Sequence, residues 1–210
     1  MLILAIILAY LLGSIPFGYI LAKALKGIDI RRYGSGNFGA TNVFREVGPG
    51  LGILVLFLDI LKGLISVTAL GDFVLSSSGV LDPILVRLIL AFAAVCGHNW
   101  TIFLQFKGGK GVATSVGALL GLSLRIPQLG LIVGLCLGVW LLVVLLTGFV
   151  SLASILASLA LPVFMFIFNQ PFKLLLFAAV LCLFSVYRHK SNISRLLRGE
   201  EKKIFSSSKD

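Results

Sequence analysis

Acidic side chains are scarce in this 210-residue chain, which has eight Asp and Glu against eighteen Lys and Arg. Hard divalent cations are usually held by carboxylate oxygens, so this shortage argues against a metal-dependent reaction, and we expect neither a metal nor another cofactor. The three cysteines each lie in an apolar segment, which is not the pattern of a disulfide framework. Only 12% of the residues are charged and 59% are hydrophobic, whereas about a quarter of a soluble domain is charged. The composition therefore predicts an integral membrane protein.

Apolar runs bounded by glycine, proline or charge predict an all-α bundle of seven transmembrane helices. The predicted segments are 2–25, 50–70, 84–106, 112–126, 129–146, 149–168 and 172–187. The fourth and seventh would be roughly 22–24 Å long at 1.5 Å per residue, against a hydrocarbon core of about 30 Å. A five-helix arrangement with these two segments re-entrant stays open. We expect residues 1–199 to form a single transmembrane domain and residues 200–210 a polar, poorly ordered tail.

Basic residues are distributed unequally between the two ends of the predicted helices. With the N-terminus outside, fourteen of the eighteen Lys and Arg residues fall on the cytoplasmic side. The positive-inside rule therefore predicts an external N-terminus and a cytoplasmic C-terminus. Because the charges cluster in loops between apolar segments, they indicate topology and binding of small anions, not of nucleic acid.

A glycine- and lysine-rich turn, Lys107-Gly-Gly-Lys-Gly111, directly precedes the fourth predicted helix. Glycines allow a tight turn whose N–H groups point at one spot, and the helix adds the positive end of its dipole. The lysines add full charges, so the turn is predicted to bind an anion such as phosphate. It is not a Walker A loop, because glycine rather than Ser or Thr follows Lys110. The alternative is a basic turn that only orients two membrane helices.

Three further polar stretches lie at the same predicted membrane face. Residues 34–45, Gly-Ser-Gly-Asn-Phe-Gly-Ala-Thr-Asn-Val-Phe-Arg, predict a structured loop rich in donors, with a flexible linker as the alternative. Its terminal Arg45 can hold an oxyanion with two hydrogen bonds. Residues 149–155 open the sixth helix with two serines, of which Ser151 is expected to cap it. Residues 187–192 end the seventh helix and carry a histidine and an asparagine three residues apart, which share a face if the helix continues.

Asp59 and Lys62 are spaced i, i+3 inside the second predicted helix. They are expected to neutralise one another in the bundle interior, although an intramembrane pair is also a functional candidate. His98 stands next to Trp100, where an interfacial structural role is expected rather than catalysis.

Four stretches together resemble one family. Residues 34–45, 106–114 (Phe-Lys-Gly-Gly-Lys-Gly-Val-Ala-Thr), 150–155 (Val-Ser-Leu-Ala-Ser-Ile) and 187–192 (Tyr-Arg-His-Lys-Ser-Asn) resemble the motifs of the bacterial acyl-phosphate:glycerol-3-phosphate acyltransferases, the PlsY family. The resemblance implies a seven-helix inner-membrane enzyme that transfers a fatty acyl group from acyl phosphate to the sn-1 hydroxyl of glycerol 3-phosphate. The products would be lysophosphatidic acid and inorganic phosphate, in the first step of phospholipid synthesis. Acyl-CoA and acyl carrier protein would not be donors, and a soluble acyltransferase would supply the acyl phosphate.

The same resemblance assigns site residues by position. Catalytic roles fall on Ser35, Arg45, Lys110, Ser154, His189 and Asn192, and binding of the substrate phosphates falls on Gly36, Asn37, Thr41, Asn42, Lys107, Gly108, Gly109 and Gly111. Since acyl phosphate is already activated, such a site needs mostly positioning and charge stabilisation. No spare carboxylate accompanies His189, which favours direct transfer over an acyl-enzyme. The base is either His189 or an oxygen of the substrate's own phosphate.

A second hypothesis is a small organophosphate transporter that uses the same basic loops as a gate. Such a protein would place ionisable or glycine-broken groups along a path across the bilayer midplane. Here the polar groups collect at one face, and only Asp59 and Lys62 lie deep. The pattern therefore favours chemistry at the membrane surface.

Overall fold

The structure, a computed structural model, describes residues 1–77 and 81–204. Every regular element in these residues is helical, so the predicted all-α class is confirmed. The chain divides into two compact units, Met1–Arg125 and Ile126–Asp210.

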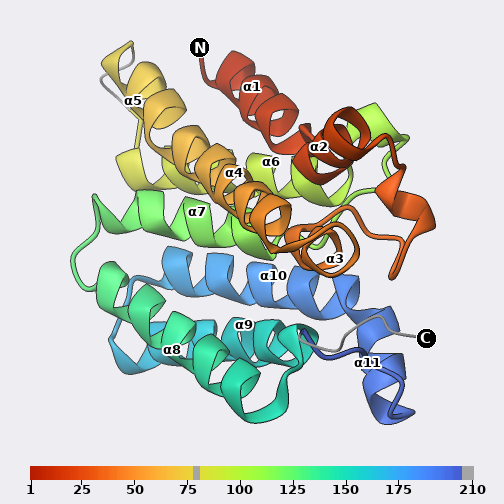
Figure 1. Cartoon of the computed structure of the whole chain (residues 1–210). Coiled ribbons are helices and arrows are strands. Elements are labelled where there is room, and N and C mark those ends of the chain that lie inside the picture. Colours follow the sequence, from red (N-terminus) through yellow and green to blue (C-terminus); the bar gives the residue numbers. More distant parts are fainter. Residues whose placement is uncertain (78–80, 205–210) are drawn as a thin grey trace. The chain divides into compact units, whose positions relative to one another are not determined.

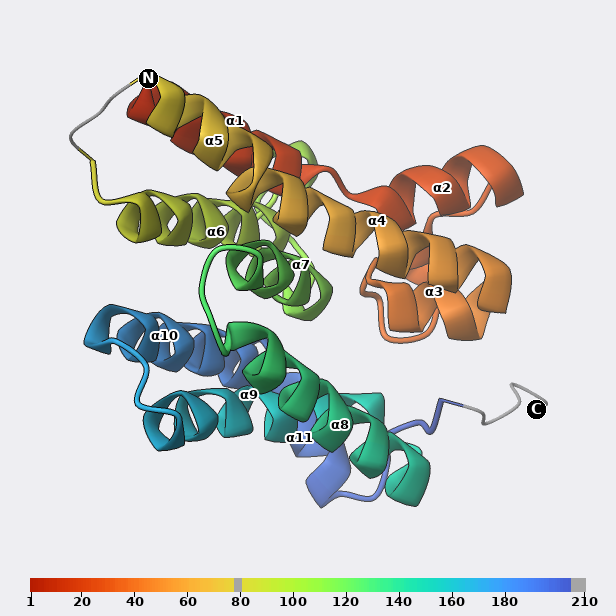
Figure 2. The ribbon, with the colours of Figure 1, turned by 90° about the vertical axis from the view of Figure 1, so that its left-hand side faces the viewer.

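The first unit contains seven α-helices and two short 3-10 turns within its described residues. The helices are α1 (Leu2–Ser14), α2 (Phe17–Lys26), α3 (Ala40–Glu46), α4 (Pro49–Val67), α5 (Ala69–Ser76), α6 (Pro83–Asn99) and α7 (Val112–Ser123), and the turns are η1 (Ile30–Arg32) and η2 (Ile102–Leu104). Helix α4 runs diagonally across α6 and α7 and packs on both (Figure 1). Helix α3 packs on α4 (Figure 2). These contacts place the two sequence stretches at 34–45 and 107–111 in one unit.

Close helix crossings explain some of the glycines in this unit. A Cβ atom on Gly63 of α4 would overlap the carbonyl of Thr114 in α7, and a Cβ atom on Gly117 of α7 would overlap the carbonyl of Ile60 in α4. Small residues at such crossings let the helix backbones approach closely. Helices α4 and α7 are therefore held at short range just beyond the glycine-rich turn.

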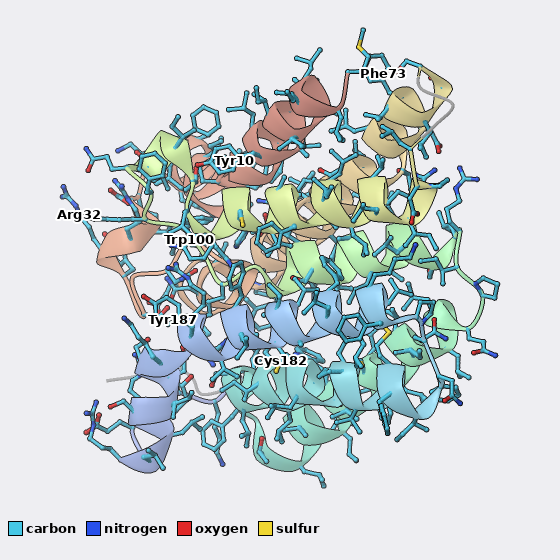
Figure 3. The ribbon with its side chains drawn as sticks, turned by 180° about the vertical axis from the view of Figure 1, so that it is seen from behind. Tyr10, Arg32, Phe73, Trp100, Cys182 and Tyr187 are labelled. Carbon is cyan, nitrogen blue, oxygen red and sulfur yellow. The ribbon has the colours of Figure 1, made fainter. Side chains whose placement is uncertain are left out.

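The first predicted segment, 2–25, is wrong as a single straight helix. The chain bends by 41° between α1 and α2, at Ile15 and Pro16. Proline lacks a backbone N–H and its ring collides with the preceding turn, so it interrupts the helix here. The end of α1 is tied to the end of α6, where the hydroxyl of Tyr10 donates to the carbonyl of Trp100 at 2.7 Å (Figure 3).

An arginine clamp joins α4, α5 and α6 away from the glycine-rich turn. Arg87 donates through Nη1 to the carbonyl of Val67 at 2.6 Å and pairs through Nη2 with Asp72. Arg125 pairs with the other oxygen of Asp72 at 3.0 Å. These contacts join the α4–α5 junction to α6.

The second unit contains α8 (Leu129–Thr147), α9 (Val150–Ile167), α10 (Phe172–Arg188) and α11 (Lys190–Leu197). Helix α9 packs on α8, α10 and α11 (Figures 1 and 2). The chain bends by 58° between α10 and α11, with His189 at the bend.

Four described segments are long and apolar enough to cross a bilayer: Pro49–Ser76, Pro83–Leu104, Leu129–Thr147 and Val150–Ile167. The number rises to six if each bent pair, α1 with α2 and α10 with α11, is one span, and α7 is a shorter apolar helix. The chain is thus a multi-helix membrane protein, and the count of seven spans stays a prediction.

Candidate functional site

The glycine-rich turn lies directly on the last turn of α6. The N–H of Gly109 donates to the carbonyl of His98 at 2.9 Å. A Cβ atom on Gly108 would overlap the backbone carbonyls of His98 and Asn99, so only glycine fits at this contact. The turn is therefore fixed by backbone contact with α6, as a preformed anion site requires.

Helix α7 begins where this turn ends. Gly111 is its N-cap, with φ of 75°, a left-handed conformation that favours glycine. No side chain caps the helix, so its first N–H groups have no partner within the helix and are available to an anion. Lys110, half-buried, immediately precedes this helix end, whereas Lys107 is exposed. The geometry thus supports the predicted cradle, with Lys110 the better placed of the two lysines.

Asn99 is a candidate that the sequence analysis did not identify. Its side chain is fully buried, and neither of its amide atoms has a hydrogen-bond partner among the described residues. A Cβ atom on Gly111 would come within 2.6 Å of the Asn99 Oδ1 atom. The amide therefore lies beside the N-terminus of α7, at the edge of the predicted cradle. The sequence signal for this residue is its position immediately after His98, in the segment that leads to the glycine-rich turn.

The stretch at 34–45 is a closed loop followed by a helix, so the expectation of a loop through Arg45 is wrong for its second half. Asn42 closes the loop: its Oδ1 atom accepts from the N–H of Ser35 at 3.0 Å, and its Nδ2 atom donates to the carbonyl of Tyr33 at 3.1 Å. The Oδ1 atom of Asn37 accepts from the N–H of Gly39 at 2.8 Å. The flexible-linker alternative does not fit these contacts.

The two asparagines thus shape the loop that carries the exposed residues Ser35 and Gly36. Thr41 and Arg45 lie on α3, half-buried, with Arg45 in its last turn. Contact of any of these residues with a substrate phosphate stays a prediction.

Asp59 and Lys62 form the predicted ion pair, with 2.8 Å between Oδ1 and Nζ. Both side chains are almost completely buried. His98 is also buried, at 4% exposure, and its Nδ1 atom lies 3.5 Å from the same Asp59 oxygen. His98 therefore faces the interior of the unit, and its expected place at the membrane interface stays a prediction.

In the second unit, His189 stands at the bend between α10 and α11 and is 2% exposed. Its Nδ1 atom lies 2.7 Å from the carbonyl oxygen of Ser185. A carbonyl can only accept, so Nδ1 carries the proton and Nε2 is the acceptor in the neutral ring. This tautomer is the one that a general base acting through Nε2 needs.

Asn192 is the first buried polar residue after that bend, on α11 rather than on a continuing α10. Its Nδ2 atom donates to Oε1 of Glu201 at 2.6 Å, and the hydroxyl of Ser151 donates to the same oxygen at 2.6 Å. The Nε atom of Arg195 donates to Oε2 at 2.8 Å. Burial alone would raise the pKa of Glu201, but these three hydrogen bonds outweigh it and hold the pKa below its ordinary value.

Two expectations change with this cluster. Ser151 does not cap α9, whose N-cap is Phe149, because its hydroxyl is bound to Glu201. Glu201, which the sequence analysis placed in a polar tail, is 8% exposed and fixes Asn192. Residues 205–210 of that tail lie outside the described residues.

Ser154 lies one turn into α9 and is 5% exposed. Its hydroxyl donates to the carbonyl of Val150 at 2.8 Å and accepts from Nε1 of Trp140 in α8 at 3.2 Å. The side chain thus faces the neighbouring helix α8.

Comparison with known proteins decides the family. The family model described as glycerol-3-phosphate acyltransferase matches residues 3–199. The chain belongs to this family. Curated glycerol-3-phosphate acyltransferases of Desulforamulus reducens and Thermoanaerobacter pseudethanolicus are 45% and 44% identical to it, each over 96% of this chain and 94% and 95% of their own lengths.

Two crystal structures of the integral membrane glycerol 3-phosphate acyltransferase PlsY (YgiH) are similar to this acyltransferase. The glycerol 3-phosphate form has a TM-score of 0.83 at 41% identity, and the lysophosphatidic acid form has a TM-score of 0.81 at 40% identity. Each comparison covers 96% of this chain and 94% of the other. All of the predicted site residues fall within the family match, and Glu201 lies two residues beyond it.

Proposed function

We propose that this acyltransferase moves a fatty acyl group from acyl phosphate to the sn-1 hydroxyl of glycerol 3-phosphate. The products are 1-acylglycerol 3-phosphate and inorganic phosphate, and the step is the first of phospholipid synthesis. The acceptor hydroxyl attacks the acyl carbonyl carbon, the bond from that carbon to the phosphate oxygen breaks, and inorganic phosphate leaves.

The observation that carries the proposal is the anion cradle at the start of α7. Lys110, the glycine-rich turn and the uncapped helix N-terminus meet at one point. Glycerol 3-phosphate and acyl phosphate each carry a phosphate group, and inorganic phosphate is released. Substrates and products are therefore all anionic. The similar PlsY structures are named for glycerol 3-phosphate and lysophosphatidic acid, which supports the acceptor and the product proposed here.

Each motif has a role in this scheme. Lys110, the amides of the glycine-rich turn and Ser35 hold the acyl phosphate. Arg45 and the polar groups of the 34–45 stretch hold glycerol 3-phosphate. Positioning two substrates in this way supplies much of the acceleration when the donor is already activated.

Direct transfer without an acyl-enzyme fits the contacts of His189. In a Ser–His–acid triad the Nδ1 atom of the histidine faces a carboxylate. Here Nδ1 of His189 faces the backbone carbonyl of Ser185, and the Ser154 hydroxyl donates to the Val150 carbonyl. The proton of the attacking hydroxyl passes to Nε2 of His189 or to a phosphate oxygen of the substrate.

The proposal includes a location. The excess of basic residues near the predicted cytoplasmic helix ends supports an external N-terminus and a cytoplasmic site in the bacterial inner membrane. Residues 1–199 act as one transmembrane acyltransferase domain. A soluble enzyme that makes acyl phosphate supplies the donor.

The test is acyl transfer by the purified protein in detergent. Long-chain acyl phosphate, acyl-CoA and acyl carrier protein are each offered with glycerol 3-phosphate, and lysophosphatidic acid is measured. We expect product from acyl phosphate alone. Lys110→Ala should lower kcat/KM by roughly 10²–10³-fold, the cost of removing one preorganised charge-stabilising group.

Lys107→Ala is the comparison within the same turn, because Lys107 is also assigned to phosphate binding but is exposed, whereas Lys110 is half-buried. It should change kcat/KM by less than about tenfold, as expected for a solvent-screened charge. Product from acyl-CoA or acyl carrier protein would contradict the donor assignment. No product from any donor, with glycerol 3-phosphate still bound, would favour the transporter.

A further inference from the structure

Three ionisable side chains outside the proposed catalytic set form a buried cluster in the first unit. Asp59 and Lys62 of α4 are each 1% exposed, and His98 of α6 is 4% exposed. Asp59 lies 2.8 Å from the Lys62 ammonium and 3.5 Å from His98 Nδ1. We call Asp59, Lys62 and His98 the charged hub.

The charged hub is anchored at the junction of α1 and α2. Lys62 Nζ donates to the carbonyl of Ile15 at 3.0 Å, at the break between α1 and α2. It also lies 5.6 Å from the centre of the Phe17 ring, a cation–π distance. The lysine therefore ties the carboxylate of Asp59 to a fixed point of the backbone.

His98 connects this anchor to both anion-binding stretches. A Cβ atom on Gly109 would overlap His98 Nε2, so the ring edge lies against the glycine-rich turn. The Phe38 ring, in the loop closed by Asn42, lies 5.6 Å from the His98 ring centre at an angle of 53°. The same imidazole thus contacts the stretch that carries Arg45 and the turn that carries Lys110.

Stability alone does not account for these buried charges. Replacing a buried ion pair by apolar residues of similar volume is often neutral or stabilising, because desolvation offsets the attraction. A charged pair does provide a fixed orientation for a polar ring, which an apolar side chain lacks. Functional groups must be held within about 0.5 Å of their working positions, so such orientation has a direct use here.

We propose that the charged hub is a positioning device: His98, oriented by Asp59 and Lys62, sets the two anion-binding stretches relative to each other. The hypothesis rests on the proposed function, since it takes those stretches as the phosphate-binding groups. His98 does not touch the reacting atoms in this account. Its loss should therefore weaken phosphate binding and leave the chemical step of the saturated enzyme largely intact.

The experiment compares His98→Leu, which removes both ring nitrogens, with His98→Gln, whose amide reaches toward the position of Nε2. Inorganic phosphate binding is measured by calorimetry in detergent, and KM and kcat for glycerol 3-phosphate are measured by acyl transfer. His98→Leu should raise the phosphate Kd and KM by roughly tenfold or more, as expected for a misplaced binding loop. The kcat should change by less than about threefold, and His98→Gln should recover part of the loss.

Two further variants separate positioning from general damage. Asp59→Asn combined with Lys62→Met keeps the net charge and removes the anchor, so it should raise KM in the same direction as His98→Leu. Arg87→Met is the control: it breaks the ion pair between the buried Arg87 of α6 and the half-exposed Asp72 of α5, and Arg87 lies eleven residues before His98, roughly 16 Å along the helix. It should lower the melting temperature without changing KM.

Unchanged KM and phosphate Kd in His98→Leu would overturn the hypothesis. So would a fall in kcat at unchanged KM, which would place His98 in the chemical step, or an equal rise of KM in Arg87→Met. If His98→Leu does not fold, His98→Gln and the double variant decide by the same criteria. A wild-type protein that binds phosphate but transfers no acyl group refutes the proposed function, and the phosphate Kd still tests the hub. If the wild-type protein binds no phosphate, the hypothesis that the charged hub positions phosphate-binding stretches is refuted.

Discussion

Removal of the Glu201 carboxylate should destabilise the second unit. The carboxylate is 8% exposed and accepts from the hydroxyl of Ser151, the amide of Asn192 and the guanidinium of Arg195. Glu201→Ala leaves all three donors without this acceptor. Removing one partner of a buried charged pair costs about 3–5 kcal/mol, and the lower end applies because Arg195 is 29% exposed. We therefore expect a loss of about 3 kcal/mol in the free energy of unfolding.

Glu201→Gln is the graded variant, because its amide oxygen can still accept from Ser151 and Asn192. It loses the charge that faces Arg195, so the expected loss is about 1–1.5 kcal/mol. Glu200→Ala is the control, since Glu200 pairs with Arg198 at the surface, where both side chains are more than half exposed. That variant should stay within about 0.5 kcal/mol of the wild type.

The assay is equilibrium denaturation in detergent, followed by acyl-transfer kinetics of the folded protein. Because Glu201 fixes Asn192, the Ala variant should also lose roughly tenfold or more in kcat/KM. The reasoning about a buried acceptor is refuted if Glu201→Ala and Glu200→Ala are equally stable. The reasoning about Asn192 is refuted if folded Glu201→Ala has wild-type kinetics.

Three more predictions concern stability and pH. Asn42→Ala removes the hydrogen bonds that close its loop. It should raise the KM for glycerol 3-phosphate and lower the free energy of unfolding by about 1–3 kcal/mol. An unchanged KM would show that the loop does not hold substrate. Gly111→Ala forces a left-handed conformation on a residue with a side chain, costing about 1–2 kcal/mol by denaturation, and should weaken inorganic phosphate binding. For pH, the pKa of Glu201 is lower in the folded protein than in the unfolded chain, so its stabilisation is present above the unfolded pKa and is lost as pH falls through the folded pKa. Wild type should therefore lose more stability than Glu201→Gln between neutral pH and the acid range, and parallel pH profiles would contradict this.

Hydrophobic patterning predicted most of the helices because the apolar runs are long and clearly bounded. The predicted segment 50–70 corresponds to α4, Pro49–Val67, and 129–146 corresponds to α8, Leu129–Thr147. The bends were harder to predict. Pro16 gives a local reason for the first bend, whereas the bend at His189 has neither proline nor glycine beside it.

The candidate site was predictable where neighbouring residues define it, as in the turn from Lys107 to Gly111. It was not predictable where partners lie far apart in the sequence. Ser151 and Glu201 are fifty residues apart, and no local pattern joins them. The contact of His98 with Asp59 likewise depends on how α4 packs on α6, so the sequence alone left His98 with an interfacial role.

The most direct test of direct acyl transfer measures phosphate release and product formation in the same reaction. Acyl phosphate labelled on its phosphate is mixed with purified protein, first without and then with labelled glycerol 3-phosphate. We predict no burst of phosphate before the acceptor is added, and afterwards one lysophosphatidic acid for each phosphate released. A stoichiometric burst of phosphate without acceptor would indicate an acyl-enzyme, and product formed without acyl phosphate would contradict the donor.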